Sequence, residues 1–471
     1  MSPQFYALLL VFFRPITRMT IPSKTDLELA STAVRKLMAA GADAADAIAA
    51  AGTSLGVSFR MGKLEDVERS EGTDLGIRAM VKGGDGAMRQ AVVSLTDTSG
   101  PALDEAVERV IAMARIAPDD PYCGLAAKSR LATEIADLDL DDGQEPDADT
   151  LALRAEAAEK AALDVAGVTN SMGAGAGWSR SQVALVTSDG FEGTYSGSSH
   201  SISCSVLAGE GTGMERDYDY TSSRHLSELD APEKVGKSAA DKAVRRLNPR
   251  KMKSQAVPVI YDPRVSGGLV GHLAGAVSGA SVARGTSFLK DRMGQQVMAS
   301  GLAIMDDPRI IRGRSSKPFD GEGVAADKLA LVEDGVLQSW IMDSSSARQL
   351  GLETSGRAAR GTGGPPGPST TNLYMEAGKL SVEELMADIT EGFYITELIG
   401  MGVNGITGDY SRGAAGYWIE NGELTFPVTE ITVAGNLKDM FMAMTPASDL
   451  VFRYGTNAPT MRAEGMTIAG A

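Results

Sequence analysis

The sequence predicts an α+β protein, with an N-terminal α/β domain followed by a C-terminal, β-barrel-like domain rich in antiparallel strands. Amphipathic helical stretches alternate with extended segments up to about residue 249. Beyond that point, Asp334-Gly335 and Asn421-Gly422 separate alternating apolar runs, which is a hairpin pattern. The 54 glycines and only 5% aromatic residues favour many turns over a helical bundle.

The chain of 471 residues is long enough for about two or three domains. Residues 1–18 are predicted to be an upstream extension, because their apolar run is too short to span a bilayer and lacks the flanks of a secretory signal. The N-terminal α/β domain is then expected over 19–249. A short basic connector begins at Arg250, so the C-terminal β-rich domain is expected over 250–471.

Composition argues against some classes of ligand and indicates the cellular compartment. A net charge of −16 repels phosphate backbones and anionic lipids, which argues against direct binding of nucleic acid or of a membrane. The two cysteines, Cys123 and Cys204, are too few for a disulfide framework and fit a reducing compartment. We therefore expect a cytoplasmic protein.

Periodicity defines the elements of both halves. Amphipathic helices are expected at 25–40, 101–117, 150–166, 232–247 and 265–283. Extended segments are expected at 44–51, 57–67, 76–80, 87–94 and 183–208 and around the two C-terminal hairpins. The glycine-rich and proline-rich stretch 360–372 is expected to be a loop. This pattern predicts a barrel or a sandwich for the C-terminal half.

Two formal motifs fail on their context. Residues 52–56 match GxSxG, but a nucleophile elbow must precede a helix, and here an extended segment follows; we interpret the motif as a hairpin turn. Residues 400–405 match GxGxxG, but the glycine-rich stretch that follows cannot form the helix that would bind a pyrophosphate. Neither motif predicts a catalytic or dinucleotide site.

The three histidines offer little for catalysis. His200 and Cys204 lie in an alternating extended segment, so they are about 13 Å apart and cannot form a dyad. His225 is interpreted as a solvated loop residue. His272 lies on the predicted helix, but Leu273 follows where a metallopeptidase needs a glutamate, and no second histidine follows. We expect His272 to pack beside the core, and we expect no metal, cofactor or catalytic residue in this chain.

Several segments of the sequence resemble one known family. They are DLGIRAMV and MARIAPDDPYCGLA in the first half, and VSGGLVGHLAGAVSGASVARGTSFL, PFDGEGV, GVNGITGDYSRGAAGYWIENGEL and PVTEITVAGNLKDM in the second. With these the chain, from about Asp26 to Gly470, resembles the TldD/PmbA family, described as modulators of DNA gyrase and as metalloproteases, and in particular its PmbA (TldE) branch. The resemblance implies a two-subunit intracellular protease that accepts unfolded peptides.

The resemblance also implies which metal ligands this chain lacks. The TldD branch carries a zinc-binding HExxxH on the helix that aligns with His272, together with a cysteine near the C-terminus. Its glutamate falls on Leu273 here and its second histidine on Val277, and no cysteine follows Cys204. The chain thus looks like the metal-free partner of a TldD-like, HExxxH-bearing subunit that would hold the zinc.

Three functions remain open at this point. The first is a non-catalytic subunit that binds unfolded peptide for its partner, and the second is a stand-alone peptide-binding or regulatory protein without proteolytic activity. A homodimer is possible in place of the heterodimer. The third is a metal-independent hydrolase that uses Asn404, Asp409 and Arg412, which are also our candidates for contacting peptide. Polar residues in such a glycine-rich turn more often bond to nearby backbone groups.

Overall fold

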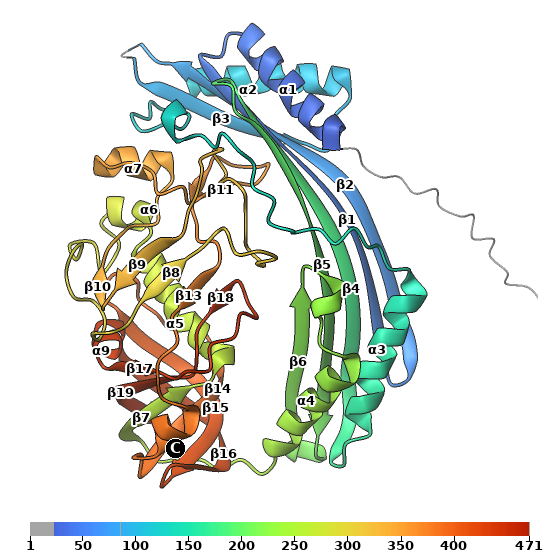
Figure 1. Cartoon of the computed structure of the whole chain (residues 1–471), viewed down its shortest axis with the longest axis vertical. Coiled ribbons are helices and arrows are strands. Elements are labelled where there is room, and N and C mark those ends of the chain that lie inside the picture. The colour runs from blue at the N-terminus through green and yellow to red at the C-terminus, as the bar shows by residue number, and fades with distance from the viewer. Residues whose placement is uncertain (1–22, 85, 471) are drawn as a thin grey trace, which may run out of the picture.

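A computed structural model describes residues 23–84 and 86–470, so the predicted extension at 1–18 lies outside the described residues. Figure 1 shows a long curved sheet, and the C-terminal half of the chain faces the concave face of this sheet. The predicted α+β class with antiparallel sheets is confirmed. Among the described residues, no helix is both long enough and apolar enough to cross a membrane.

The N-terminal sheet has six antiparallel strands in the order β3-β2-β1-β4-β5-β6. Their bounds are β1 (Ala44–Arg60), β2 (Lys63–Lys82), β3 (Met88–Leu95), β4 (Val168–Thr187), β5 (Glu192–Ala208) and β6 (Glu215–Ser223). The length and curvature of these strands make the sheet a half-barrel (Figure 1).

Two pairs of helices cover one face of this sheet. The first pair is α1 (Ser23–Ala39) and α2 (Gly100–Ile116), and the second is α3 (Ala148–Leu163) and α4 (Pro232–Arg245). Each pair packs its apolar side on a different end of the sheet and forms a separate core. The residues that α2 buries are those that its periodicity predicts: Leu103, Ala106, Val107, Val110, Ile111 and Ala114.

A closed five-stranded barrel organises the C-terminal half. Its strands are β7 (Gln255–Tyr261), β14 (Glu391–Ile399), β15 (Asp409–Glu420), β16 (Glu423–Asn436) and β19 (Met461–Ala469). The barrel closes because β19 pairs with both β7 and β16, which leaves none of these five strands as an edge. A short sixth strand, β17 (Met444–Pro446), pairs with the start of β19.

Helix α5 (Pro263–Ala276) leaves the barrel directly after β7 and is followed by α6 (Gly279–Ala283). A second sheet contains β8 (Ile304–Asp306), β9 (Leu329–Glu333), β10 (Val336–Leu337), β13 (Leu373–Met375) and β18 (Thr456–Asn457). The remaining elements are α7 (Ser344–Leu350), α8 (Val382–Met386), α9 (Leu437–Met442), the pair β11 (Ala358–Ala359) and β12 (Gly367–Pro368), and 3-10 turns at Lys128–Arg130, Gly211–Gly213 and Leu226–Glu228.

Several sequence-based expectations are wrong in detail. The segments 44–51 and 57–67 belong to two long strands, β1 and β2, that turn at Met61 and Gly62, so the GxSxG stretch 52–56 lies within β1 and not in a turn. The first half of β4 was not expected to be a strand. The helix predicted at 265–283 is interrupted at Val277, where α5 ends.

Arginine side chains from the C-terminal half bind the free edge of β6. Arg264 donates to the backbone carbonyl of Tyr218 at 3.4 Å, Arg314 donates to that of Ser222 at 3.0 Å, and Arg453 donates to that of Tyr220. These three carbonyls alternate along one strand edge, which would otherwise be open to a further strand. The two halves of the molecule are therefore joined by side-chain to backbone bonds along β6.

Candidate functional site

A cavity of about 370 Å³ lies where the edge of β6 meets the barrel. Strand β6, the end of α4, helix α5 and strands β14 and β15 each contribute to its wall. The lining residues are Arg216, Asp217, Tyr218, Arg246, Arg264, Val265, Gly268, Leu269, His272, Thr396, Glu397, Leu398, Tyr410 and Arg412. The cavity therefore joins groups that are nearly 200 positions apart in the sequence.

Helix α5 brings His272 to this cavity. Asp262 caps the helix by accepting a hydrogen bond from the backbone of Arg264 at 2.9 Å, and Pro263 occupies the first turn. The ring of His272 is half-buried and meets the ring of Tyr410 edge-on, with 6.1 Å between centroids. Burial, and then the nearby charge of Arg412, lower the pKa of His272, so its imidazole is neutral at pH 7. His272 thus lines a cavity, and it packs beside the core only in part.

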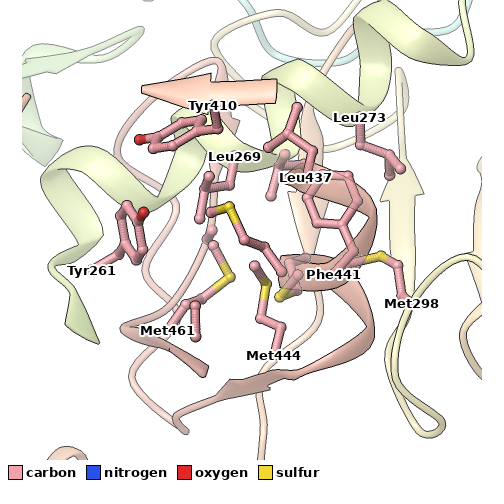
Figure 2. Close-up of a cluster of buried hydrophobic side chains, with 14 of the residues drawn as sticks. Tyr261, Leu269, Leu273, Met298, Tyr410, Leu437, Phe441, Met444 and Met461 are labelled. Carbon is pink, nitrogen blue, oxygen red and sulfur yellow. The ribbon is translucent and has the colours of Figure 1, made fainter. Parts of the chain in front are cut away.

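The two other positions of the family's metal motif lie in the core. Leu273 and Val277 are both 0% exposed. Figure 2 shows Leu273 in the apolar cluster with Met298, Leu437 and Phe441. Within 23–84 and 86–470, no three His, Cys, Asp or Glu side chains come together as metal ligands would. The residues present here therefore do not fit a zinc site of the HExxxH type.

The three candidate residues of the glycine-rich turn separate in the structure. Asn404 accepts hydrogen bonds from the backbone of Ile406, and Asp409 accepts one from the hydroxyl of Thr407 at 2.6 Å and one from Asn436 at 3.1 Å. Both are exposed and hold the turn together. Only Arg412 lines the cavity.

Arg412 is the unpaired cation of the cavity. Its Nε is buried without a hydrogen-bond partner, and its guanidinium forms no ion pair with any residue that the structure describes. It also lies close enough to His272 to affect the pKa of that residue. An arginine in this state offers its planar guanidinium to a carboxylate or a carbonyl of a ligand.

The other charges of the cavity are paired. Glu397 binds Arg246 at 2.6 Å and Arg216 at 3.2 Å, and Asp217 binds Arg264 at 2.7 Å. Although burial disfavours its charge, Arg246 has a raised pKa because Glu397 and Asp217 stabilise its cationic form. Both carboxylates are thus engaged in ion pairs and are not free to act as a general base.

The cavity offers a ligand both charged and neutral polar groups. The imidazole of His272 and the unpaired guanidinium of Arg412 line it, together with the hydroxyl-bearing residues Thr396 and Tyr410. His272 and Arg412 could be identified from the sequence, whereas Arg216, Arg246 and Arg264 were not. The alternation of charged and aromatic residues in 215–220 was the one local pattern that set this strand apart.

The remaining histidines and cysteines lie away from this cavity. His225 was expected to be solvated, but its side chain is only 13% exposed and its Nε2 lies 3.0 Å from the carbonyl oxygen of Asp139, so that expectation is wrong. His200 is fully buried, with its Nε2 2.9 Å from Asp142. Cys123 and Cys204 are buried free thiols.

Models of one protein family match most of the chain. The PmbA/TldA metallopeptidase domain 1 matches residues 45–114, the central domain of these metallopeptidases matches 140–247, and their C-terminal domain matches 254–470. The metalloprotease PmbA of Escherichia coli O157:H7 is 38% identical over 94% of this chain and 96% of its own length. A PmbA homologue of Haemophilus influenzae is 36% identical over 93% and 95%.

Solved structures share the fold. A putative modulator of DNA gyrase from Bacteroides thetaiotaomicron superposes with a TM-score of 0.86 at 24% identity and covers 94% of this chain and 98% of its own. TldE from Thermococcus kodakarensis gives a TM-score of 0.80 at 20% identity, with 95% and 100% covered. The family matches along the sequence and this shared architecture agree: the chain belongs to the PmbA/TldD family of metallopeptidases.

Proposed function

We propose that this chain is a metal-free, PmbA/TldE-like subunit of a cytoplasmic two-subunit metalloprotease. In this proposal a TldD-like partner with an HExxxH helix supplies the zinc, and the present chain helps to bind an unfolded peptide. The observation that carries the proposal is the complete burial of Leu273, at the position of the general base, and of Val277, at the position of a zinc ligand.

The cavity beside His272 supports the peptide-binding part of the proposal. Strand addition at the edge of β6 would compete with Arg264, Arg314 and Arg453, which already bind its carbonyls. Side chains of the cavity are therefore the better candidates for contacting peptide. Among them, Arg412 has free donors for a backbone carbonyl or a terminal carboxylate.

The test uses the full chain and its candidate HExxxH partner, purified separately and together. We expect an unfolded peptide to be cleaved only by the mixture, and elemental analysis to find much less than one zinc per copy of this chain alone. Cleavage by this chain alone, or one zinc per chain that is lost in His272→Ala, would overturn the proposal. Absence of any complex with the partner would instead favour a stand-alone peptide-binding protein.

Arg412→Met tests the cavity within that experiment. Since Arg412 forms no ion pair with a described residue, its removal should leave the fold and the complex intact. We expect it to raise the KM for peptide by about tenfold, the effect of one lost charge-assisted bond. Arg109→Met, a change of the same charge at an exposed position of α2, is the matched control. Equal kinetics for both variants would mean that this cavity does not bind the peptide.

A further inference from the structure

A second cavity, of about 280 Å³, lies between the N-terminal sheet and the loop 310–318 of the C-terminal half. Residues of β4 and β5 form one wall, on the face of the sheet that packs against Phe319 and not against the helices. The lining residues are Leu140, Ser181, Val183, Tyr195, Gly197, Arg224, Arg314, Ser315, Ser316, Lys317 and Thr370. They share no residue with the cavity beside His272.

The charges of this cavity all have the same sign. Arg224, Arg314 and Lys317 line it, and no carboxylate is among the described residues of its wall. Hydroxyls of Ser181 and Thr370 add uncharged donors. Three cations around one small cavity repel one another. A bound anion would offset this repulsion, so the cavity favours an anionic ligand.

The three cations differ in how many of their donors are already used. Arg224 is fixed, because it donates to the backbone carbonyls of Ser198 at 3.2 Å, Arg314 at 2.6 Å and Gly313 at 3.5 Å. Among the described residues, the Arg314 side chain donates from one nitrogen, to the backbone carbonyl of Ser222 at 3.0 Å. The ammonium group of Lys317 makes no hydrogen bond or ion pair within the described chain. Arg314 and Lys317 therefore keep donors for a ligand.

The acidic residues nearest to these cations are bound elsewhere. Asp306 and Asp320 face Lys317 from outside the cavity. Asp306 binds Arg357 and the hydroxyl of Thr371, and Asp320 accepts three backbone N–H groups. Asp141, near Arg224, binds Arg180 at 2.8 Å. Burial lowers the pKa of Lys317, although the nearby charges of Asp320 and Asp306 act to raise it.

The loop that carries the cations is held in place before any ligand arrives. The backbone of Ser315 donates to Asn372 at 2.9 Å, and the hydroxyl of Ser316 donates to the carbonyl of Ile310 at 2.6 Å. A Cβ at Gly197 would come within 2.8 Å of the Arg224 guanidinium, so this glycine leaves room for that arginine. A fixed loop lowers the entropic cost of binding a small ligand.

We propose that this second cavity binds a doubly charged phosphoryl group, carried by free phosphate or by a small phosphomonoester. A dianion matches the three cations better than a monovalent carboxylate, which would leave two of them uncompensated. Its oxygens can also accept from Arg314, Lys317 and the neighbouring hydroxyls at once. This site is independent of the proposed subunit function, since it shares no lining residue with the peptide-binding cavity.

Isothermal titration of the full chain with inorganic phosphate, O-phosphoserine and acetate, each at constant ionic strength in chloride, tests this assignment. We expect one saturable phosphate site per chain, and binding that weakens as the pH falls from 8 to 5 and the dianion is protonated. Tighter binding of O-phosphoserine would identify a phosphomonoester as the ligand, and tighter binding of inorganic phosphate would identify the free anion. Acetate binding as tightly as phosphate would overturn the assignment, and so would phosphate binding no better than chloride.

Variants locate the site. Lys317→Met should weaken phosphate binding by about tenfold or more, and Thr370→Val, which keeps every charge, should weaken it less. Lys160→Met, at an exposed position of α3, removes one charge elsewhere and is the matched control. Unchanged affinity in both cavity variants would overturn the location. If Lys317→Met does not fold, Thr370→Val and the pH dependence of the parent protein still decide the question.

Discussion

Asp46 in β1 and Arg360 in the C-terminal half form a buried ion pair across the two halves of the chain. Asp46 also binds Arg78 in β2, and all three side chains are at most 4% exposed. Burial alone would raise the pKa of Asp46, but the two arginines outweigh it and lower that pKa. The C-terminal half thus binds the sheet here as well as along the edge of β6.

Asp46→Asn is expected to destabilise the protein by about 3–5 kcal/mol, because it leaves two buried guanidinium groups without a carboxylate. Urea denaturation followed by tryptophan fluorescence and circular dichroism measures this change. We also expect the two probes to separate, since the variant weakens a contact between the two halves.

The matched control is Asp104→Asn, which breaks the surface pair between Lys36 and Asp104. These side chains are 35% and 61% exposed, so the change should cost less than about 1 kcal/mol. Equal effects of the two substitutions would contradict a structural role for the buried ion pair.

The helices and the tight hairpins could be predicted because their determinants are local. The buried face of α2 follows from a spacing of three and four residues, and the turn at Asn421 and Gly422 follows from two residues that adopt positive φ, at 52° and 83°. The first half of β4 gave no such pattern. Its glycine and alanine residues are poor strand formers, and it is a strand because it pairs with β5 from Val168 and with β1 from Ala174.

The candidate site was predictable only in part, for a related reason. His272 and Arg412 were singled out by a motif and a resemblance, but nothing local relates them to Arg216 or Arg246. These residues meet because the barrel docks on β6, and that contact joins positions far apart in the chain. The cationic cavity beside Lys317 also forms between residues that are far apart in the chain, and no sequence pattern predicted it.

Glu322 should make stability depend on pH. Burial, and then the nearby Asp320, raise the pKa of Glu322 to about 7, although Ser344 donates two hydrogen bonds to it. The raised pKa means that the folded protein favours the protonated form of Glu322. The stability that this provides is fully present below the ordinary pKa of 4.5 and is lost as the pH rises through about 7.

Glu322→Gln should therefore gain stability relative to the parent between pH 5 and pH 8, by an amount on the order of 1–3 kcal/mol. Its amide oxygen can still accept from Ser344. Denaturant unfolding of both proteins across this range gives the difference directly. Glu105→Gln, at an exposed position of α2, should show none, and a constant difference for Glu322→Gln would contradict the raised pKa.

Both thiols should be inert in the folded protein. Burial raises the pKa of Cys123 to about 11 and that of Cys204 to about 12, so little thiolate exists at pH 8. We expect a chromogenic disulfide reagent to modify neither cysteine until the protein unfolds, and both in denaturant. Cys204→Ala serves to assign the signal, and rapid labelling of the native parent would contradict the burial of these residues.

Leu273→Glu with Val277→His restores the spacing of the family's metal motif and tests how far α5 is from a working site. Both side chains are 0% exposed and lie in the main apolar core, so an uncompensated carboxylate there should cost several kcal/mol. Leu273→Met, which keeps the apolar character and most of the volume, should cost less than about 1.5 kcal/mol and is the control. A zinc peptidase also needs a third protein ligand, and the chain has no cysteine after Cys204.

We therefore expect the double variant to be less stable, to bind no stoichiometric zinc and to cleave no peptide, as measured by denaturation, elemental analysis and a peptide assay with the purified chain. A soluble double variant that holds one zinc and cleaves peptide by itself would mean that a third ligand is already present, and the proposal of a metal-free subunit would then fail.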